Sequence, residues 1–547
     1  MLRAWSVGRS QIYRSIATWG EPSQLAARRD SVFMQDPRGK VFTYGDLYHR
    51  SSVIAEHIII TNKDILPLRG QSISFLYPPG FEFAATLVGI WRAGAIAVPL
   101  CTSHPPAELE YLIRDSKSVQ IFADHSFRSV TEKLPFEVSN LPSETTMFPT
   151  GLELPPVADE DPGLIIYTSG TTGHPKGVVS THRALLANVT DMVDAWQWSS
   201  SDRLLHCLPL HHVHGLINGL LTPMYAGASI EFLAKFDPAE VLHRLHNARD
   251  ITVFFGVPAM FWRLLRHYKP SPSNVYPDWR HLRLVVSGSA ALLPSMFEEI
   301  VQTWGVRVLE RYGMTETGML LTNPYRPEDS RLPGSVGYPF SSVQTKLQAL
   351  DGQQVEVNRS EAVGILCVKG PMLFSQYFGR PKETAEAFDA EGFFITGDVV
   401  SQSQEDGRIR ILGRASADIL KTGGYKVSAL EIEQVLSEHP QVKEVAVIGQ
   451  PSEQWGDAIV AVLVVERGTE TEKEREKEKE REKEKERGGD FESEALRQAL
   501  REHCKTHLAP YKVPKEFILL QAELPRNVMG KINKKQLLSA IVNIPQL

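Results

Sequence analysis

Short apolar runs alternate with helix-length amphipathic segments between residues 40 and 400. In Phe83–Arg92 apolar residues recur on nearly every turn of a helix, Ala93-Gly94-Ala95 interrupts the pattern, and Ile96–Leu100 follows as a short apolar run. Runs of similar length recur at Leu164–Tyr167, Val253–Phe255, Leu282–Val286 and Val306–Leu309. Brief apolar runs separated by helical segments are typical of buried strands, so the pattern predicts an α/β protein.

A different pattern begins near Gly413. Amphipathic periodicity predicts helices at Ser428–His439 and Glu492–His507, and apolar runs predict strands at Val442–Ile448 and Ala458–Val465. We therefore expect a large multi-sheet α/β domain followed by a small α+β domain. The small domain carries an insertion, 467–490, in which Glu472–Arg487 alternates acidic and basic residues without one apolar side chain. Such a segment cannot join a core, which favours a solvated loop or fraying helix over a partner-binding element.

Composition excludes several classes of protein. The chain has 547 residues, 42% of them hydrophobic, and a net charge of −6, so no basic excess favours nucleic acid. Its four cysteines are far apart and form no CxxC pair, which is typical of reduced thiols rather than a disulfide scaffold. The most apolar stretch, Phe83–Leu100, contains Arg92 and Pro99, so we expect no membrane span.

The N-terminus has its own composition. The first acidic residue is Glu21, and three arginines, three serines and several bulky apolar residues precede it. An Arg-rich, Ser-containing, acid-free leader is typical of a mitochondrial transit peptide, so we assign residues 1–20 to targeting. The alternative is an ordinary frayed terminus.

Ten consecutive residues after the apolar run Leu164–Tyr167 have the chemistry of a phosphate-binding loop. They are Thr168, Ser169, Gly170, Thr171, Thr172, Gly173, His174, Pro175, Lys176 and Gly177. Glycines let the backbone turn its N–H groups inward, the hydroxyls add donors, and the lysine adds a cation. The Gly-Lys-Ser/Thr spacing of a Walker A loop is absent.

This loop resembles the signature loop of the adenylate-forming superfamily, which includes acyl-CoA synthetases. Further segments resemble the other motifs of that family and follow in the expected order: Thr86–Leu100, Glu310–Thr317, Thr396-Gly397-Asp398, Gly413-Arg414, Gly423-Gly424-Tyr425 and Leu524–Lys531. The resemblance covers nearly everything from residue 40 to 540. It implies an AMP-forming acid–thiol ligase that uses ATP, Mg²⁺ and CoA, with domains at 21–413 and 419–547 and a hinge at 414–418.

The resemblance also implies roles for single residues. Thr168 to Lys176 would hold the β- and γ-phosphates of ATP, Thr315 the α-phosphate, and Glu316 the Mg²⁺ ion. Tyr312 would stack on adenine, with Ser287 and Ser289 in the pocket wall. Asp398 would accept hydrogen bonds from the ribose, with Arg414 nearby.

Catalysis would need two positions of the small domain. Lys531 would reach the reacting carboxylate and the α-phosphate for adenylate formation. The small domain would then rotate and bring the face around Gly424 to the thiol tunnel, in the manner of a hinge that absorbs φ/ψ change.

Four histidines gather at His206, His211, His212 and His214. A metal site is one interpretation, but no acidic or cysteine cluster with matching spacing accompanies them. The resemblance favours His212 as a residue lining the acyl pocket.

Arg263 follows a buried strand and Gly256-Val257-Pro258. Facing the pocket, its guanidinium would pair with a second carboxylate of the substrate and penalise an alkyl chain. The alternative is a solvated helix face. These segments together resemble malonyl-CoA synthetases, including mitochondrial members, which implies malonate and methylmalonate as substrates and supply of malonyl-CoA for fatty-acid synthesis in the mitochondrial matrix.

Three other hypotheses remain. A short- or medium-chain monocarboxylate–CoA ligase differs in whether Arg263 faces the pocket. A catalytically silent nucleotide-binding protein would show damage in the phosphate loop, Glu316, Asp398 or Lys531, and none is damaged. A module that loads a carrier protein would carry a carrier domain after Lys531, where the chain soon ends.

Overall fold

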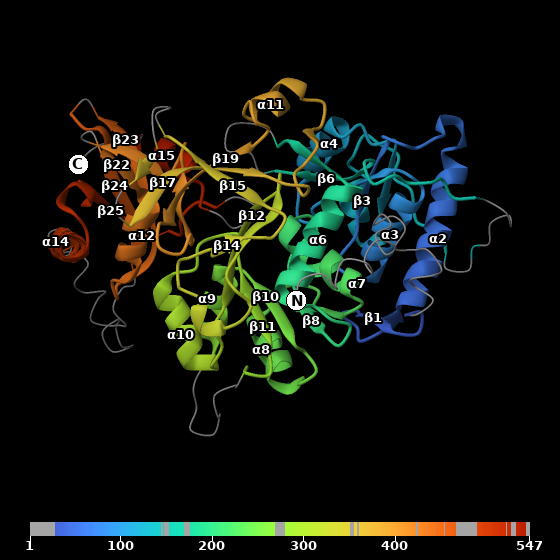
Figure 1. Cartoon of the computed structure of the whole chain (residues 1–547), viewed down its shortest axis with the longest axis horizontal. Coiled ribbons are helices and arrows are strands. Elements are labelled where there is room, and N and C mark those ends of the chain that lie inside the picture. The colour runs from blue at the N-terminus through green and yellow to red at the C-terminus, as the bar shows by residue number, and fades with distance from the viewer. Residues whose placement is uncertain are drawn as a thin grey trace, which may run out of the picture. The chain divides into compact units, whose positions relative to one another are not determined.

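The computed structural model describes residues 28–143, 146, 153–168, 175–268, 279–350, 355–357, 360–422, 425–452, 454–465, 489–520, 522–526 and 532–542 (Figure 1). The chain forms two compact units, each described here by itself. The first unit comprises Met1–Thr345 and Val368–Ile395, and the second Lys346–Cys367 and Thr396–Leu547. This division does not test the expected hinge at 414–418, which stays a prediction.

The first unit contains a nine-stranded sheet in the order β14-β13-β12-β11-β10-β8-β9-β1-β2. Its strands are β1 (Val32–Gln35), β2 (Val41–Thr43), β8 (Arg203–His206), β9 (Ser229–Phe232), β10 (Val253–Gly256), β11 (Leu284–Ser287), β12 (Leu309–Met314), β13 (Gly318–Thr322) and β14 (Tyr338–Pro339). The strands from β12 to β1 pair in parallel, and the strands at both edges pair antiparallel.

A six-stranded sheet in the same unit has the order β18-β7-β6-β4-β3-β5. Its strands are β3 (Ser72–Leu76), β4 (Ile96–Pro99), β5 (Gln120–Ala123), β6 (Pro162–Tyr167), β7 (Gly177–Thr181) and β18 (Gln376–Tyr377). Residues 72–76 of β3 and 96–99 of β4 are buried throughout, as expected for parallel strands covered on both faces.

The helices of the first unit are α2 (Tyr44–Thr61), α3 (Phe81–Arg92), α4 (Pro106–Asp115), α5 (Arg128–Thr131), α6 (His182–Trp196), α7 (Thr222–Ala226), α8 (Pro238–Asn247), α9 (Pro258–His267), α10 (Pro294–Trp304) and α11 (Pro381–Glu386). A π-helical segment, η4 (His214–Leu221), and short 3₁₀ turns η2 (Lys63–Ile65), η3 (His125–Phe127) and η5 (Glu328–Ser330) complete it. Helices α2 and α3 run side by side because Gly89 lets them approach: a Cβ there would lie 2.7 Å from Ile54.

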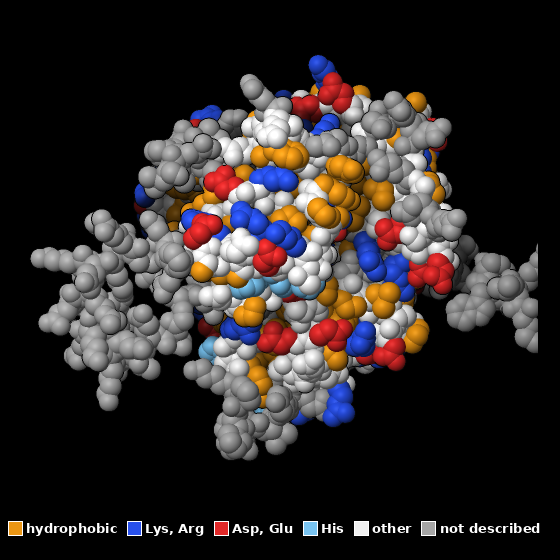
Figure 2. Space-filling model, turned by 90° about the vertical axis from the view of Figure 1, so that its left-hand side faces the viewer, with side chains coloured by type: hydrophobic (Ala, Val, Ile, Leu, Met, Phe, Trp, Pro, Cys, Tyr) orange, Lys and Arg blue, Asp and Glu red, His pale blue; other side chains and the backbone are white. Residues whose placement is uncertain are grey.

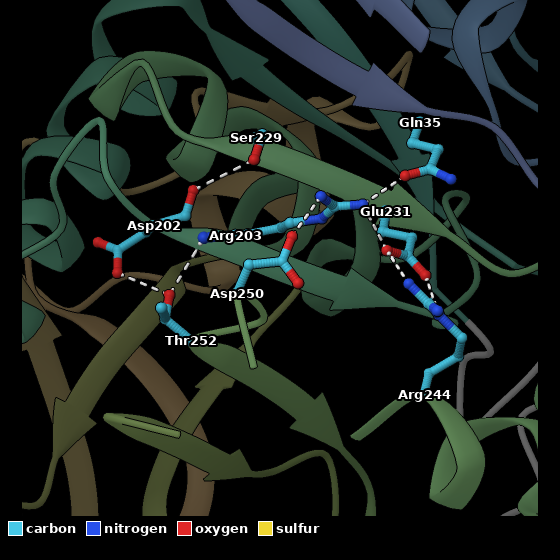
Figure 3. Close-up of polar contacts among 8 residues, drawn as sticks. All are labelled: Gln35, Asp202, Arg203, Ser229, Glu231, Arg244, Asp250 and Thr252. Carbon is cyan, nitrogen blue, oxygen red and sulfur yellow. Dashed lines mark hydrogen bonds and ion pairs between the residues drawn. The ribbon is translucent and has the colours of Figure 1, made fainter. Parts of the chain in front are cut away.

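Charged side chains around the start of β8 form a paired network (Figure 3). Glu231 in β9 is buried and contacts Arg203 at 2.6 Å and Arg244 at 2.5 Å. Asp202, just before β8, accepts hydrogen bonds from Thr252 (2.8 Å) and Arg283 (2.6 Å). The network ties β8, β9 and β10 together where they begin.

The second unit contains two five-stranded sheets. One comprises β15 (Gln344–Gln348), β16 (Glu356–Val357), β17 (Glu361–Lys369), β19 (Phe394–Ser403) and β20 (Ile409–Arg414); the other comprises β21 (Ile419–Thr422), β22 (Tyr425–Ser428), β23 (Val442–Ser452), β24 (Gly456–Val465) and β25 (Glu516–Leu520). Its helices are α12 (Ala429–Ser437), α14 (Gly489–His507) and α15 (Lys534–Val542), with the 3₁₀ turn η6 (Pro510–Lys512).

Alternation along β24 builds the two cores of the second sheet. Ile459, Ala461 and Leu463 face a cluster that includes residues of α12 and α14, whereas Val460 and Val462 face a cluster that includes Leu537 of α15. Successive strand residues point to opposite faces, so one apolar run supplies both layers.

Most predicted elements are present close to their expected positions. One strand was misplaced: the apolar run Val306–Leu309 lies before β12, which begins only at Leu309 and continues through Met314. The residues before Leu309 form an apolar linker, and a linker of this kind has the same local pattern as a buried strand. The linker follows α10, whose C-cap residue Gly305 adopts the left-handed conformation (φ 70°). Residues 1–20 and nearly all of the 467–490 insertion lie outside the described residues.

None of the helices that the structure describes is both long and apolar enough to cross a membrane. On the face in Figure 2, acidic and basic side chains are interspersed, with histidines forming a pale-blue band. In the second unit the imidazole rings of His439, His503 and His507 lie next to one another, with centroids 5.5 and 4.6 Å apart.

Candidate active site

The carboxyl ends of the parallel strands carry polar groups that have no hydrogen-bond partner among the described residues. Strands β8, β10, β11 and β12 run in the same direction, so their carboxyl ends lie at one edge of the nine-stranded sheet. Ser287 ends β11, Arg311 lies within β12, and His214 begins η4 after β8. Ligands of open α/β sheets bind at this edge.

Arg311 is the most unusual of these residues. Its side chain is buried, and among the described residues neither Nε nor Nη2 has a hydrogen-bond partner. Burial lowers the pKa of its guanidinium to about 9. Gly288 makes room for it, because a Cβ at that position would lie 2.4 Å from the guanidinium carbon. An unpaired buried cation is expensive unless a ligand supplies the anion.

His214 and Ser289 lie beside this guanidinium. His214 Nδ1 is 3.3 Å from Ser289 Oγ, and its buried Nε2 has no partner among the described residues. Burial, and then the charge of Arg311, holds the pKa of His214 well below its usual range, so the ring is neutral. Ser289 has φ +69°, a conformation that costs a non-glycine residue about 1–2 kcal/mol. The hydroxyl of Ser287 is also buried without a partner there.

His206 has a structural role. Its Nε2 lies 2.9 Å from the Gly215 carbonyl, and its Nδ1 accepts a hydrogen bond from the Leu208 N–H at 3.2 Å. Burial lowers its pKa to about 4. The neutral ring therefore holds the start of η4 in place.

The turn between β12 and β13 presents Thr315 and Glu316. The Thr317 hydroxyl and backbone close the turn onto Met314, and Asn188 of α6 accepts a hydrogen bond from the Met319 N–H at 2.8 Å. Glu316 is buried, and its Oε1 accepts a hydrogen bond from the Tyr377 hydroxyl at 2.9 Å. A buried carboxylate is a suitable ligand for a hard cation such as Mg²⁺.

The base of the phosphate loop joins β6 to β7. The Thr168 N–H donates to the Lys176 carbonyl at 3.0 Å. Lys176 Nζ lies 2.5 Å from Glu383 and 4.9 Å from the centre of the Tyr377 ring, and hydrogen bonding to Lys176 lowers the pKa of Glu383. Tyr377 therefore contacts both Lys176 and Glu316, which brings the end of the loop next to the predicted metal ligand.

In the second unit, Asp398 and Arg414 face each other across β19 and β20, with 3.2 Å between their charged groups. Arg414 N–H also donates to Asp418 at 2.9 Å. Lys534 lies 2.6 Å from Asp418 and 2.7 Å from Glu433. The expected ribose ligand and the expected hinge thus belong to one network of charges.

The structure does not bring every predicted residue to this site. Arg263 lies on the exposed face of α9, with its guanidinium 5.0 Å from the centre of the Phe236 ring. The exposure of this side chain does not locate it relative to a substrate, so the pocket-facing role of Arg263 and its alternative, a solvated helix face, stay predictions. His212 is half-buried, and its ring lies 4.0 Å from that of His211. Tyr312 is half-buried in β12.

The structure bears on the metal-site interpretation of the histidines but does not describe several of the predicted site residues. Among the described residues, no three His, Cys, Asp or Glu side chains are grouped to hold a metal, which gives the histidine-rich segment no support as a metal site. Ser169 to His174, Gly424 and Lys531 lie outside the described residues, so their roles stay predictions.

Sequence reasoning missed Arg311 and His214 as site residues. Arg311 belongs to the Glu310–Thr317 motif, in which the family resemblance implies roles for Tyr312, Thr315 and Glu316. The signal was present: an arginine inside a strand bounded by buried residues needs an anionic partner.

The chain matches the AMP-binding enzyme family over residues 22–378 and the AMP-binding enzyme C-terminal domain over residues 431–531. The chain belongs to this family. It is therefore an AMP-forming ligase that binds ATP and joins an acid to CoA.

Relatives in this family align over most of their lengths. The chain is 38% identical over 544 residues to the mitochondrial malonate–CoA ligase of Xenopus laevis, covering 92% of this chain and 89% of that protein. The crystal structure of ATP-bound MatB from Rhodopseudomonas palustris has a TM-score of 0.80 and 30% identity, covering 97% of this chain and 100% of the other. A malonyl-CoA ligase with methylmalonyl-CoA and AMP bound has a TM-score of 0.63 and 32% identity, covering 93% and 99%.

Proposed function

We propose that this enzyme ligates malonate, and also methylmalonate, to CoA through an acyl-adenylate, with release of AMP and pyrophosphate. The observation that carries the proposal is the buried guanidinium of Arg311 beside His214 and Ser289, whose Nε and Nη2 have no hydrogen-bond partner among the described residues. In a dicarboxylate, one carboxylate reacts with ATP and the second can pair with the guanidinium of Arg311.

The chemistry of the pocket supports a second carboxylate over an alkyl chain. Nε and Nη2 of Arg311 are parallel donors of the kind that bind a carboxylate bidentately. The neutral imidazole of His214 and the hydroxyls of Ser287 and Ser289 add further hydrogen-bonding groups. A monocarboxylate would leave these buried groups unsatisfied, which costs about 1–3 kcal/mol for each group.

The reacting carboxylate and ATP would use the other residues. The Thr168–Lys176 loop would hold the β- and γ-phosphates and Thr315 the α-phosphate, with Tyr312 against adenine and Asp398 and Arg414 at the ribose. Glu316 would hold Mg²⁺, which offsets phosphate charge when bound. Lys531 would neutralise the charge that develops between carboxylate and α-phosphate.

The relatives' names support the substrate and the compartment. The Xenopus laevis relative is a mitochondrial malonate–CoA ligase. Together with the acid-free leader at 1–20, this supports a matrix enzyme that supplies malonyl-CoA for fatty-acid synthesis.

The test is ATP-dependent thioester formation with malonate, methylmalonate, acetate and octanoate. We expect dicarboxylates to be preferred. Arg311→Met should lower kcat/KM for malonate by about 100-fold, because charge-assisted hydrogen bonds contribute about 1.5–3 kcal/mol each, and should change acetate use little.

Arg266→Met is the matched control, since it makes the same replacement on the exposed face of α9, where Arg266 pairs with Glu299. It should leave malonate use within about twofold. A preference for acetate or octanoate in the parent enzyme would instead support the alternative, a short- or medium-chain monocarboxylate–CoA ligase.

The two half-reactions test the proposed movement of the small domain. Lys531→Ala should suppress adenylate formation and spare thioester formation from supplied malonyl-adenylate. If both steps lost activity equally, Lys531 would not act specifically in adenylate formation. The proposed movement of the small domain about 414–418 would then also lack support.

A further inference from the structure

An asparagine in η4 is buried with its hydrogen-bonding groups unsatisfied by the described residues. Asn218 is 0% exposed, and neither its Oδ1 nor its Nδ2 has a hydrogen-bond partner in that part of the chain. The residues on either side of it along η4 include the buried apolar side chains of Ile217 and Leu220. A buried amide that makes no hydrogen bonds lowers stability, so this position calls for an account beyond packing.

Asn188 of α6 shows how a structural asparagine is paired in the same unit. It is 3% exposed, and its Oδ1 accepts a hydrogen bond from the Met319 N–H at 2.8 Å. Its Nδ2 donates to the carbonyl oxygens of Ala184 at 3.2 Å and Met372 at 3.4 Å. Both asparagines are buried, yet only Asn188 has its donor and acceptor used within the described residues.

The helical geometry of η4 places Asn218 on the same face as His214. A Cβ at Gly219 would lie 2.3 Å from His206 Nε2, and the same nitrogen lies 2.9 Å from the Gly215 carbonyl. Gly215 and Gly219 therefore lie on the face of η4 that packs against His206. His214 and Asn218 each precede one of these glycines, so they share the neighbouring face, one turn apart. π-Helical turns of this kind are frequent at functional sites.

The face that carries His214 belongs to the acyl site. His214 Nδ1 is 3.3 Å from Ser289 Oγ, and its ring lies 6.0 Å from that of Phe255 near the carboxyl end of β10. Burial, and then the charge of Arg311, lowers the pKa of His214, which places the guanidinium close to the imidazole. His214, Arg311 and Asn218 all carry buried nitrogen atoms without a hydrogen-bond partner among the described residues. Asn218 therefore extends this set by one helical turn.

We propose that Asn218 is a specificity-determining residue of the acyl pocket, whose Nδ2 donates a hydrogen bond to the second carboxylate of the substrate. This inference rests on the proposed function, because it needs a dicarboxylate. Arg311 supplies the charge, and Asn218 supplies a neutral donor, which avoids the cost of burying a second cation. An apolar group at the same place would leave the amide without a partner, so Asn218 also selects against alkyl chains.

The first experiment compares kcat/KM for malonate with kcat/KM for 3-methylbutanoate, in which an isopropyl group replaces the second carboxylate. Asn218→Leu should lower the value for malonate by about 10-fold or more, because a hydrogen bond to a charged group is lost. The same variant should leave the value for 3-methylbutanoate unchanged or raise it. Equal losses for the two acids would overturn the proposal.

The second experiment separates a ligand site from a structural one by thermal unfolding without ligands. Asn218→Leu should leave Tm unchanged or raise it, because it removes a buried amide that is not bonded within the protein. Asn188→Leu is the matched control and should lower Tm by about 3 °C or more, because it leaves the Met319 N–H buried without its acceptor. Leucine is bulkier than asparagine, so Asn218→Ala and Asn188→Ala repeat the comparison. A large fall in Tm for both Asn218 variants would overturn the proposal.

The outcomes distinguish failure of this inference from failure of the proposed function. If the parent enzyme prefers malonate and both Asn218 variants keep the same preference over 3-methylbutanoate, the inference alone is wrong. If the parent enzyme uses 3-methylbutanoate as well as malonate, the proposed function is wrong and the inference fails with it.

Discussion

Around the start of β8, Arg203 and Arg244 share the carboxylate of Glu231 (Figure 3), and Arg283, just before β11, pairs with Asp202. At the carboxyl ends of the parallel strands, by contrast, Arg311 is buried beside a neutral histidine and two serines. The same side chain has opposite surroundings at the two ends of one sheet. The paired end ties strands together, and the unpaired end keeps hydrogen-bonding capacity for a ligand. Within one sheet, therefore, paired charges contribute to stability at one end, and unpaired groups are available for ligand binding at the other.

The largest expected effect is at the paired end. Glu231→Gln should lower the free energy of unfolding by about 3 kcal/mol, because it leaves Arg203 and Arg244 without their shared carboxylate. Urea unfolding measures this change, and kcat/KM for malonate should stay within about twofold. Glu299→Gln removes an exposed pair with Arg266 and serves as the control, with an expected loss below about 1 kcal/mol. Equal losses of unfolding free energy in the two variants would contradict the expected difference between the buried pairs of Glu231 and the exposed pair of Glu299.

At the unpaired end the effect on stability should reverse. Arg311→Met should leave the free energy of unfolding unchanged or raise it by about 1–2 kcal/mol, because it removes a buried charge whose Nε and Nη2 find no partner in the described part of the chain. Thermal unfolding without ligands measures this, in parallel with the loss of malonate activity. A large destabilisation would indicate that Arg311 pairs within the protein and is not held for a substrate.

The pH dependence of substrate choice sharpens the same point. The pKa of Arg311 is lowered to about 9, so its positive charge is present below that pH and is lost as the pH rises through it. The ratio of kcat/KM for malonate to that for acetate should be flat from pH 7 to about 8.5 and then fall toward about tenfold per pH unit. Using the ratio cancels the titration of groups that serve both substrates. A flat ratio up to pH 10.5 would exclude the guanidinium as the discriminating group.

The smallest effect concerns Ser289. Ser289→Gly should stabilise the protein by about 1 kcal/mol, because glycine adopts φ +69° without strain. It should also lower malonate kcat/KM several-fold by removing the hydroxyl that contacts His214. Ser289→Ala is the control: it loses the hydroxyl and keeps the strain, so activity should fall without a gain in stability.

Much of the fold was predictable from local pattern. Apolar runs located strands such as β4, β6 and β10, and β24 shows why: its alternating residues fill cores on two faces. The run before β12 was misplaced, because apolar residues in a linker and in a strand have the same local pattern.

The site was less predictable, since the decisive contacts join segments far apart in the chain. Tyr377 lies about two hundred residues after Lys176 and links it to Glu316. No spacing rule connects these positions.

By itself, the sequence determined the α/β class, the smaller α+β part, the glycine-rich phosphate loop and the family, because periodicity and short motifs are local properties of the chain. Only the tertiary structure decided which arginine is buried with no anionic partner among the described residues and which histidine stands beside it. Burial and electrostatic pairing depend on residues that meet in space, and a linear pattern does not specify which residues meet.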